Sequence, residues 1–203
     1  MKLKVAGLVM VIAALAARDV VAQRRGLVDI SPDHYRHGFW LSGGLGWGQE
    51  AYKYGSDPYV EGLGKPTFSL AIGGTPDAHV RLGGEATVWV NDYQDFDTGE
   101  NITETLSSVM LTARVFPVRT SGFYLKGGAG LGVTAADVDF GFGSSETGFG
   151  TVLGAGYELK LGRSLFIAPE MTWHRSTFEK RGDDTLHERL VNFSVGITWQ
   201  PGR

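Results

Sequence analysis

The sequence contains no cysteine among its 203 residues, and neither sign of charge predominates. Without cysteine, disulfide scaffolds, thiolate zinc sites and cysteine nucleophiles are excluded. The 19 Lys and Arg residues oppose 22 Asp and Glu residues, which gives a formal net charge of −3. Nucleic-acid binding requires a concentrated positive field that displaces phosphate counterions. We therefore expect no nucleic-acid partner.

Long apolar runs are also missing, apart from one near the N-terminus. There, residues 5–17 are apolar, follow two early lysines and precede the small residues 20–22. The run is too short to cross about 30 Å of hydrocarbon as a helix, and this arrangement is typical of a cleaved signal peptide. We predict cleavage after residue 22, followed by a periplasmic linker over residues 23–36. An uncleaved N-terminal membrane anchor is the alternative.

Glycine is abundant, with 30 residues, but it shows no Gly-X-Y period and accompanies 42% apolar residues, so the chain is expected to fold. From residue 37 onward no helical period is evident. Apolar and small or polar residues instead alternate with a period of two, which indicates β-strands. Eight such runs cover residues 39–47, 68–72, 80–90, 109–115, 123–133, 149–159, 165–173 and 191–199.

The connections between these runs alternate in length. Short turns at 75–79, 118–122 and 161–164 alternate with long polar connections at 50–65, 92–104, 135–146 and 176–187. An antiparallel up-and-down barrel with both chain ends on the short-turn side has this pattern. We predict an all-β, eight-stranded barrel over residues 37–203.

Alternation alone leaves open which face points outward. A soluble, lipocalin-like carrier would bury the apolar face, whereas a transmembrane barrel would expose it to lipid. Two features favour the membrane barrel. The other face carries glycines and opposite charges, which suit a narrow interior. The apolar face carries aromatic residues near strand ends, as in a girdle at the membrane interfaces: Phe39, Trp47, Phe68, Phe123, Phe149, Tyr157, Trp173 and Trp199.

The glycine-rich strand segments 128–132 and 154–157 and the turn at 161–164 complete a resemblance. Together with the signal peptide and the eight-strand meander, they resemble the small bacterial outer-membrane β-barrels of the outer membrane protein A and X type. The resemblance implies a monomer in the outer membrane that contacts lipid and lipopolysaccharide and is inserted by the barrel-assembly machinery. One departure is the four-residue segment 200–203 after Trp199, because such barrels usually end on an aromatic residue.

Six charged residues on the inward face are expected to form an ion-pair network that closes the lumen. An eight-stranded barrel has room for side chains but not for a wide water column. The chain is then not a general porin, and the alternative is a continuous narrow pore in which these groups pair with water. The six residues are Arg81, Glu85, Arg114, Lys126, Glu158 and Glu170.

One constellation could be catalytic, namely His174, Ser176 and Glu188. Its spacing is similar to the histidine, serine and acid of lipid A deacylases, where the histidine takes the serine proton and the acid orients the imidazole. Thr177, however, stands where those enzymes have asparagine, and the alternation turns His174 and Ser176 inward rather than toward lipid. We predict that the chain is not an enzyme, with a lipid hydrolase as the alternative.

Two further groups could in principle hold a metal ion. Asp92, Asp95, Asp97 and Glu100 could offer oxygen ligands to calcium, but their spacing misses the EF-hand pattern. His34 and His37 lack a third ligand nearby. No Gly-x-Gly-x-x-Gly segment opens a helix, so a nucleotide loop is rejected. We expect no metal site and no cofactor.

The sequence therefore favours a barrel with a structural or surface-interaction role. Four extracellular loops would carry the contact with an extracellular ligand, since function usually concentrates in surface loops. The outer-membrane hydrolase and the soluble carrier remain the alternative functions.

Overall fold

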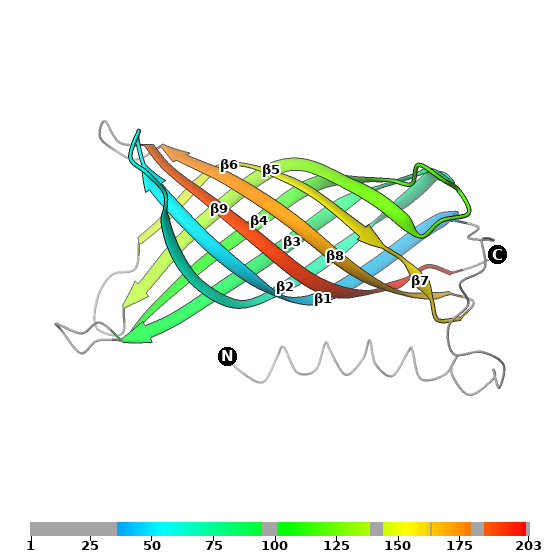
Figure 1. Cartoon of the computed structure of the whole chain (residues 1–203), viewed down its shortest axis with the longest axis horizontal. Coiled ribbons are helices and arrows are strands. Elements are labelled where there is room, and N and C mark those ends of the chain that lie inside the picture. Colours follow the sequence, from blue (N-terminus) through cyan, green and yellow to red (C-terminus); the bar gives the residue numbers. More distant parts are fainter. Residues whose placement is uncertain (1–35, 95–100, 139–143, 163, 180–184, 202–203) are drawn as a thin grey trace.

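The computed structural model describes residues 36–94, 101–138, 144–162, 164–179 and 185–201. These residues form one antiparallel sheet that closes on itself through pairing between β6 and β8 (Figure 1). No helix within these ranges is long and apolar enough to cross a membrane. The strands are β1 (Gly38–Tyr54), β2 (Val60–Asp77), β3 (Val80–Gln94), β4 (Asn101–Val115), β5 (Phe123–Val138), β6 (Ser144–Tyr157), β7 (Leu159–Lys160), β8 (Leu165–Glu179) and β9 (Thr185–Trp199).

The short element β7 continues the line of β6. The ladder is interrupted at Glu158, whose backbone N–H donates to the carbonyl of Gly122 at 2.9 Å. Pairing with β8 then resumes between Leu159 and Ile167. The two elements therefore act as one strand, and the prediction of an eight-stranded up-and-down barrel is confirmed.

The strands extend further than the alternation of apolar residues predicted. At the end opposite the C-terminus, pairing of β1 with β9 continues to Tyr54 opposite Leu186, and pairing of β3 with β4 continues to Gln94 opposite Asn101. The backbone ladder needs hydrogen bonds rather than apolar side chains, so it persists where the outward residues become polar. The connection expected over 50–65 shrinks to residues 55–59, and Gly55 there adopts a φ of +48°.

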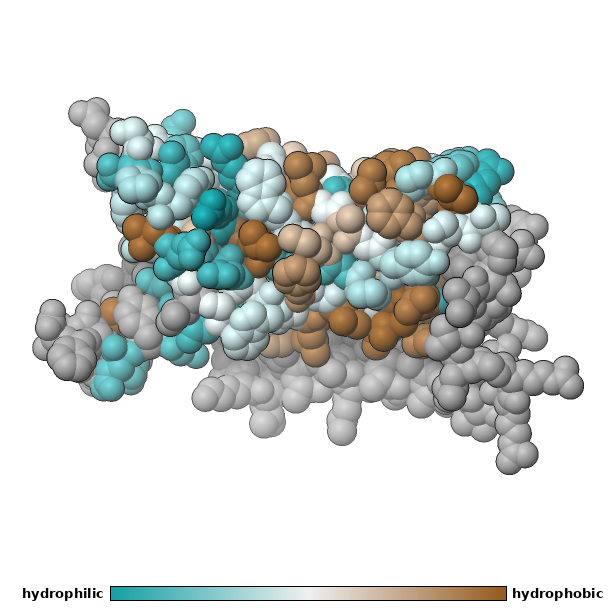
Figure 2. Space-filling model, viewed as in Figure 1, coloured by the Kyte–Doolittle hydropathy of each residue, from teal (hydrophilic) through white to brown (hydrophobic). Residues whose placement is uncertain are grey.

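Apolar side chains cover the outside of the barrel. Leu111 is 77% exposed and Val109 is 65% exposed, whereas their inward neighbours Met110 and Thr112 are buried. Figure 2 shows apolar residues over the middle of the barrel and hydrophilic residues gathered toward its left end. Such a continuous apolar exterior is stable against lipid but not in water. The soluble carrier with an apolar interior is therefore wrong for this chain.

The eight aromatic residues expected at the interfaces all point outward. Their exposed fractions run from 38% at Tyr157 to 62% at Phe149. Near the chain ends, the rings of Phe39 and Trp199 pack edge to face at 6.5 Å. These rings therefore lie on the surface that faces lipid.

The apolar band ends before the strands do. On the outward face, Trp47 is followed by Gln49, Trp173 by Arg175 and Val191 by Arg189. We call the strand segments beyond these positions, on the side away from the chain ends, the outer extensions. Since their outward residues are polar, the outer extensions lie outside the membrane-spanning band.

Candidate functional site

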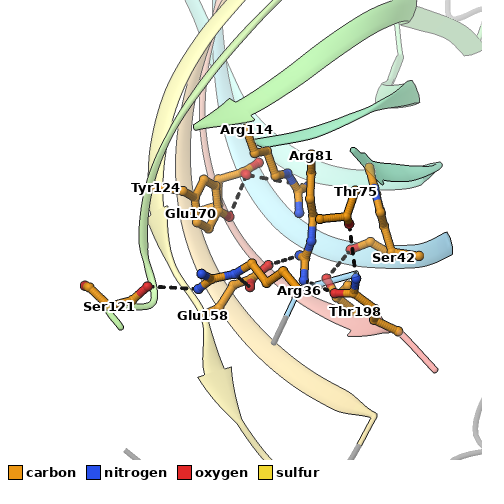
Figure 3. Close-up of polar contacts among 12 residues, drawn as sticks. Arg36, Ser42, Thr75, Arg81, Arg114, Ser121, Tyr124, Glu158, Glu170 and Thr198 are labelled. Carbon is orange, nitrogen blue, oxygen red and sulfur yellow. Dashed lines mark hydrogen bonds and ion pairs between the residues drawn. The ribbon is translucent and has the colours of Figure 1, made fainter. Parts of the chain in front are cut away.

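The barrel interior near the chain ends is occupied by a first group of ion pairs, shown in Figure 3. Glu158 accepts from Arg81 and from Arg36, whose Nε lies 3.4 Å from Oε2, and all three side chains are fully buried. Arg81 also donates to Gln200 Oε1 at 2.5 Å. The Arg36 guanidinium stacks on the Phe116 ring at 3.6 Å, which adds a cation–π contact.

A second group lies deeper in the barrel. Lys126 Nζ contacts Glu85 Oε1 at 2.6 Å and Glu170 Oε1 at 2.8 Å. Arg114 reaches both carboxylates at 3.7 Å. The Tyr124 hydroxyl donates to Glu170 Oε2 at 2.8 Å (Figure 3). Each carboxylate therefore has more than one cationic partner.

The sheet register explains why the cations need these carboxylates. Arg81, Arg114 and Lys126 are direct cross-strand neighbours on β3, β4 and β5. Like charges at such positions repel one another, so the arrangement is stable only with anions close by. Glu158 and Glu170 supply them from the line of β6 and β7 and from β8.

Small residues make room for these side chains. An added Cβ at Gly156 would collide with the Tyr124 hydroxyl, and one at Gly128 would lie 2.9 Å from Thr112 Cγ2. Glycine at these inward positions lets long side chains cross a narrow lumen. The glycine content of the strands is thus part of the interior packing.

All six charged residues singled out in the sequence lie inside the barrel and form one or other of these two groups. Arg36, Tyr124 and Gln200 also take part but were missed. Tyr124 and Gln200 occupy positions at which the alternation along β5 and β9 turns side chains inward, and this alternation could have identified them. Arg36 is the last residue of the expected linker, and no periodicity marks it; the remainder of that linker and residues 1–22 lie outside the described residues.

An apolar cluster and a hollow occupy the other end of the interior. The cluster contains Trp89, Leu106, Phe178, Leu186 and Leu190. Beside it lies a cavity of about 250 Å³, which we call the outer vestibule. Its walls combine aromatic residues with four carboxylates from four strands: Glu50, Tyr52, Tyr54, Trp89, Glu104, Thr105, Leu106, Thr134, Ala135, Glu146, Leu186 and Glu188.

The vestibule carboxylates lie on the outer extensions, and for Glu188 and Glu50 the surroundings disfavour the charged form. Burial, with smaller contributions from the charges of Glu50, Glu104 and Glu146, raises the pKa of Glu188 to about 8. On β9, Glu188 lies between the buried Leu186 and Leu190, which exclude water from it. Burial likewise raises the pKa of Glu50 to about 7, with a smaller contribution from Glu104.

The three residues considered for catalysis are all buried and face the interior. His174 shares a hydrogen bond with Thr172 Oγ1 at 3.2 Å. Ser176 lies opposite Glu188 in the register of β8 and β9. Among the described residues, no hydrogen bond joins the imidazole to the Ser176 hydroxyl. The arrangement therefore lacks the contact through which a histidine would take the serine proton.

The metal-ligand candidates are only partly described. Asp92 lies on the outer extension of β3, whereas Asp95, Asp97 and Glu100 lie outside the described residues, as does His34. His37 is exposed next to the start of β1. Within the described ranges, no group of three or more His, Asp or Glu side chains is placed to hold a metal ion.

Comparison with solved structures finds barrels of low sequence identity. Ail of Yersinia pestis is 15% identical with a TM-score of 0.49, and the alignment covers 79% of this chain and 99% of Ail. Neisserial surface protein A is 18% identical with a TM-score of 0.47, covering 81% and 97%. The N-terminal barrel of Pseudomonas aeruginosa OprF is 13% identical with a TM-score of 0.36, covering 74% and 96%.

These similarities are too distant to assign the chain to a family, and the family assignment comes from the sequence. No curated protein matches it. A family model described as the outer membrane protein beta-barrel domain matches residues 6–198, which is nearly the whole chain. With the closed barrel and its apolar exterior, this match places the chain in the bacterial outer membrane, as a member of the outer membrane protein β-barrel family.

Proposed function

We propose that this protein is a closed outer-membrane barrel with a structural and surface-interaction role, rather than a diffusion channel. The observation that supports the proposal best is the buried ion-pair network across the lumen. Lys126 joins Glu85 to Glu170 from one wall to another, and the Lys126 side chain is only 1% exposed. A hydrated ion crossing at this level would have to displace these contacts.

The apolar cluster adds a second barrier. Phe178 and Trp89 are almost fully buried in the interior, and Leu190 is 3% exposed. Ions pass apolar constrictions poorly because they must shed water there. The two barriers lie at different depths, so closure does not depend on one contact alone.

Planar-bilayer recording of the purified, refolded barrel tests the proposal. We expect no large, steady conductance from the native sequence. Arg119→Ser, which removes an exposed cation at a short turn, serves as a control and should record like the native protein. Large, steady conductance from the native barrel would contradict a closed lumen.

The interaction role has support on the outward face of the outer extensions. Arg175 and Arg189 are cross-strand partners on β8 and β9, immediately beyond Trp173 and Val191. Two adjacent cations at the edge of an apolar band suit the phosphates of lipopolysaccharide. Arg175→Gln with Arg189→Gln should reduce the thermal stabilisation that added lipopolysaccharide gives; an unchanged stabilisation would remove this partner from the proposal.

The same proposal includes a monomeric barrel that the assembly machinery inserts, with its outer surface available to an extracellular ligand. The outward-facing Trp199, at the end of β9, supplies an aromatic residue close to the C-terminus. Trp199→Ser is expected to reduce the amount of folded barrel in the outer membrane of the host. An unchanged amount would show that insertion does not use this aromatic residue.

A further inference from the structure

We propose that the outer vestibule binds a linear aliphatic amine with two or more ammonium groups. This proposal supplies a ligand class for the surface interaction proposed above, and it rests on that proposal only for the orientation of the barrel. The cavity of about 250 Å³ is small for a drug-sized molecule. It lies on the strand segments that extend beyond the membrane band.

Once Glu50 and Glu188 have released their protons, above a pH of about 8, the vestibule holds more negative charge than its described surroundings neutralise. The salt bridges formed within the described residues involve Glu85, Glu158 and Glu170 on the anionic side of the lumen, and none involves Glu50, Glu146 or Glu188. In the described part of the chain, the buried cations are Arg36, Arg81, Arg114 and Lys126, which all lie in the two deeper groups. An added cation would therefore relieve repulsion among the vestibule carboxylates.

Unsatisfied polar atoms point to the same place. Glu188 is 6% exposed, yet its Oε2 has no hydrogen-bond partner. Oε2 of Glu146 is also buried without a partner, as is Oδ1 of Asn91, the cross-strand neighbour of the vestibule residue Glu104. Buried carboxylate oxygens without partners are costly. All three atoms are acceptors, so the missing group is a donor, and ammonium supplies three donors with a positive charge.

The lining favours an organic cation over a metal ion. No group of three carboxylates in the described part of the chain is close enough to coordinate a metal. The acids instead come from β1, β4, β6 and β9 and share the lining with Tyr52, Trp89 and Leu106. Separated anions match ammonium groups spaced along a chain, and aromatic faces attract both methylenes and cations.

Isothermal titration of the refolded barrel in detergent tests this assignment, with spermidine, putrescine, propylamine and Mg²⁺ as probes, at about pH 8.5, where Glu50 and Glu188 have released their protons. We expect saturable binding in the order spermidine, putrescine, propylamine. Glu188→Gln keeps the shape of the side chain but removes its charge, and should weaken spermidine binding about tenfold or more, because it removes a charge-assisted hydrogen bond. Glu179→Gln, at an exposed outward position on β8, has the same change in net charge and should bind as the native protein does.

Each outcome decides the matter once heat-modifiable gel mobility shows that the variants are folded. Absence of saturable amine binding, or equal weakening by Glu188→Gln and Glu179→Gln, would overturn the proposal. Tighter binding of Mg²⁺ than of spermidine would also overturn it, in favour of a metal site. Conductance recordings distinguish failure of this proposal from failure of the proposed closed lumen. A barrel that conducts ions and also binds spermidine would contradict the closed lumen but support the vestibule site.

Discussion

Replacing Lys126 with methionine tests whether the deeper ion pairs hold the barrel together. Lys126 is the closest cation to both Glu85 and Glu170, at 2.6 and 2.8 Å, and all three side chains are at most 10% exposed. In Lys126→Met, Arg114 is the only cation described within ion-pair distance of Glu85 and Glu170, at 3.7 Å from each carboxylate. Two buried anions then share one distant guanidinium.

The expected loss is large compared with the stability of a domain. Removal of one partner from a buried ion pair costs about 3–5 kcal/mol, because the remaining charge is left in a medium that solvates it poorly. Typical unfolding free energies are about 5–15 kcal/mol. Adding Glu170→Gln removes one of the two stranded anions. The double variant should therefore lose less than the sum of the two single losses, by at least about 1 kcal/mol.

Urea unfolding in lipid vesicles, followed by heat-modifiable gel mobility, measures these free energies. Arg119→Met is a matched control, because its ion pair with Asp77 is exposed and long at 4.0 Å; it should unfold as the native protein does. A loss below about 1 kcal/mol for Lys126→Met, or strict additivity in the double variant, would refute the view that these charges depend on one another.

Three other predictions follow from the same structure. In the folded protein Glu50 and Glu188 keep their protons to higher pH than in the unfolded chain, where a glutamate releases its proton near the ordinary pKa of 4.5. The free energy of unfolding should therefore fall as pH rises from about 5 to about 8. Glu188→Gln should flatten this slope, and an unchanged slope would contradict the raised pKa of Glu188. Gly130→Ala should lower the free energy of unfolding in urea by about 1–3 kcal/mol, because its Cβ would collide with the backbone of Val109 and Met110. Gly84→Ala should not destabilise the barrel, because the Cβ there meets open space. Equal effects of the two substitutions would argue against the inward packing. Ser176→Ala should leave the lipid A profile of the host unchanged in mass spectrometry, and an altered profile would restore the hydrolase alternative.

The fold could be predicted from the sequence because a barrel imposes a simple pattern. Alternation with period two gave the strands, and the alternating lengths of the connections gave their order. The inward charges were visible because parity assigns them to one face, as with Arg81 and Arg114. Strand ends were less predictable, because the polar outer extensions pair through their backbone and leave no apolar signal.

The vestibule could not be predicted for a different reason. Glu50, Glu104, Glu146 and Glu188 are far apart in the sequence; the first three belong to regions expected to be loops, and Glu188 comes directly after the loop expected over 176–187. Glu188 was considered only as a partner of His174. Their proximity depends on the closure of the barrel and on the length of the strands, which only the three-dimensional arrangement supplies. The contribution of Arg36 to the lumen could not be predicted either, because Arg36 precedes β1 and enters the interior from outside the strands.

Spin labelling along β4 tests the central claim most directly, namely that apolar side chains face lipid around a closed interior. The chain has no cysteine. A single cysteine introduced at each position from Val109 to Val115 can therefore be spin-labelled without labelling at any other site. In lipid vesicles, labels at the outward positions 109, 111, 113 and 115 should collide with oxygen dissolved in the bilayer. Labels at the inward positions 110, 112 and 114 should be protected from both oxygen and a water-soluble nickel complex. Nickel accessibility at the inward positions would show an open pore, and nickel accessibility at the outward ones would contradict the orientation of the barrel wall.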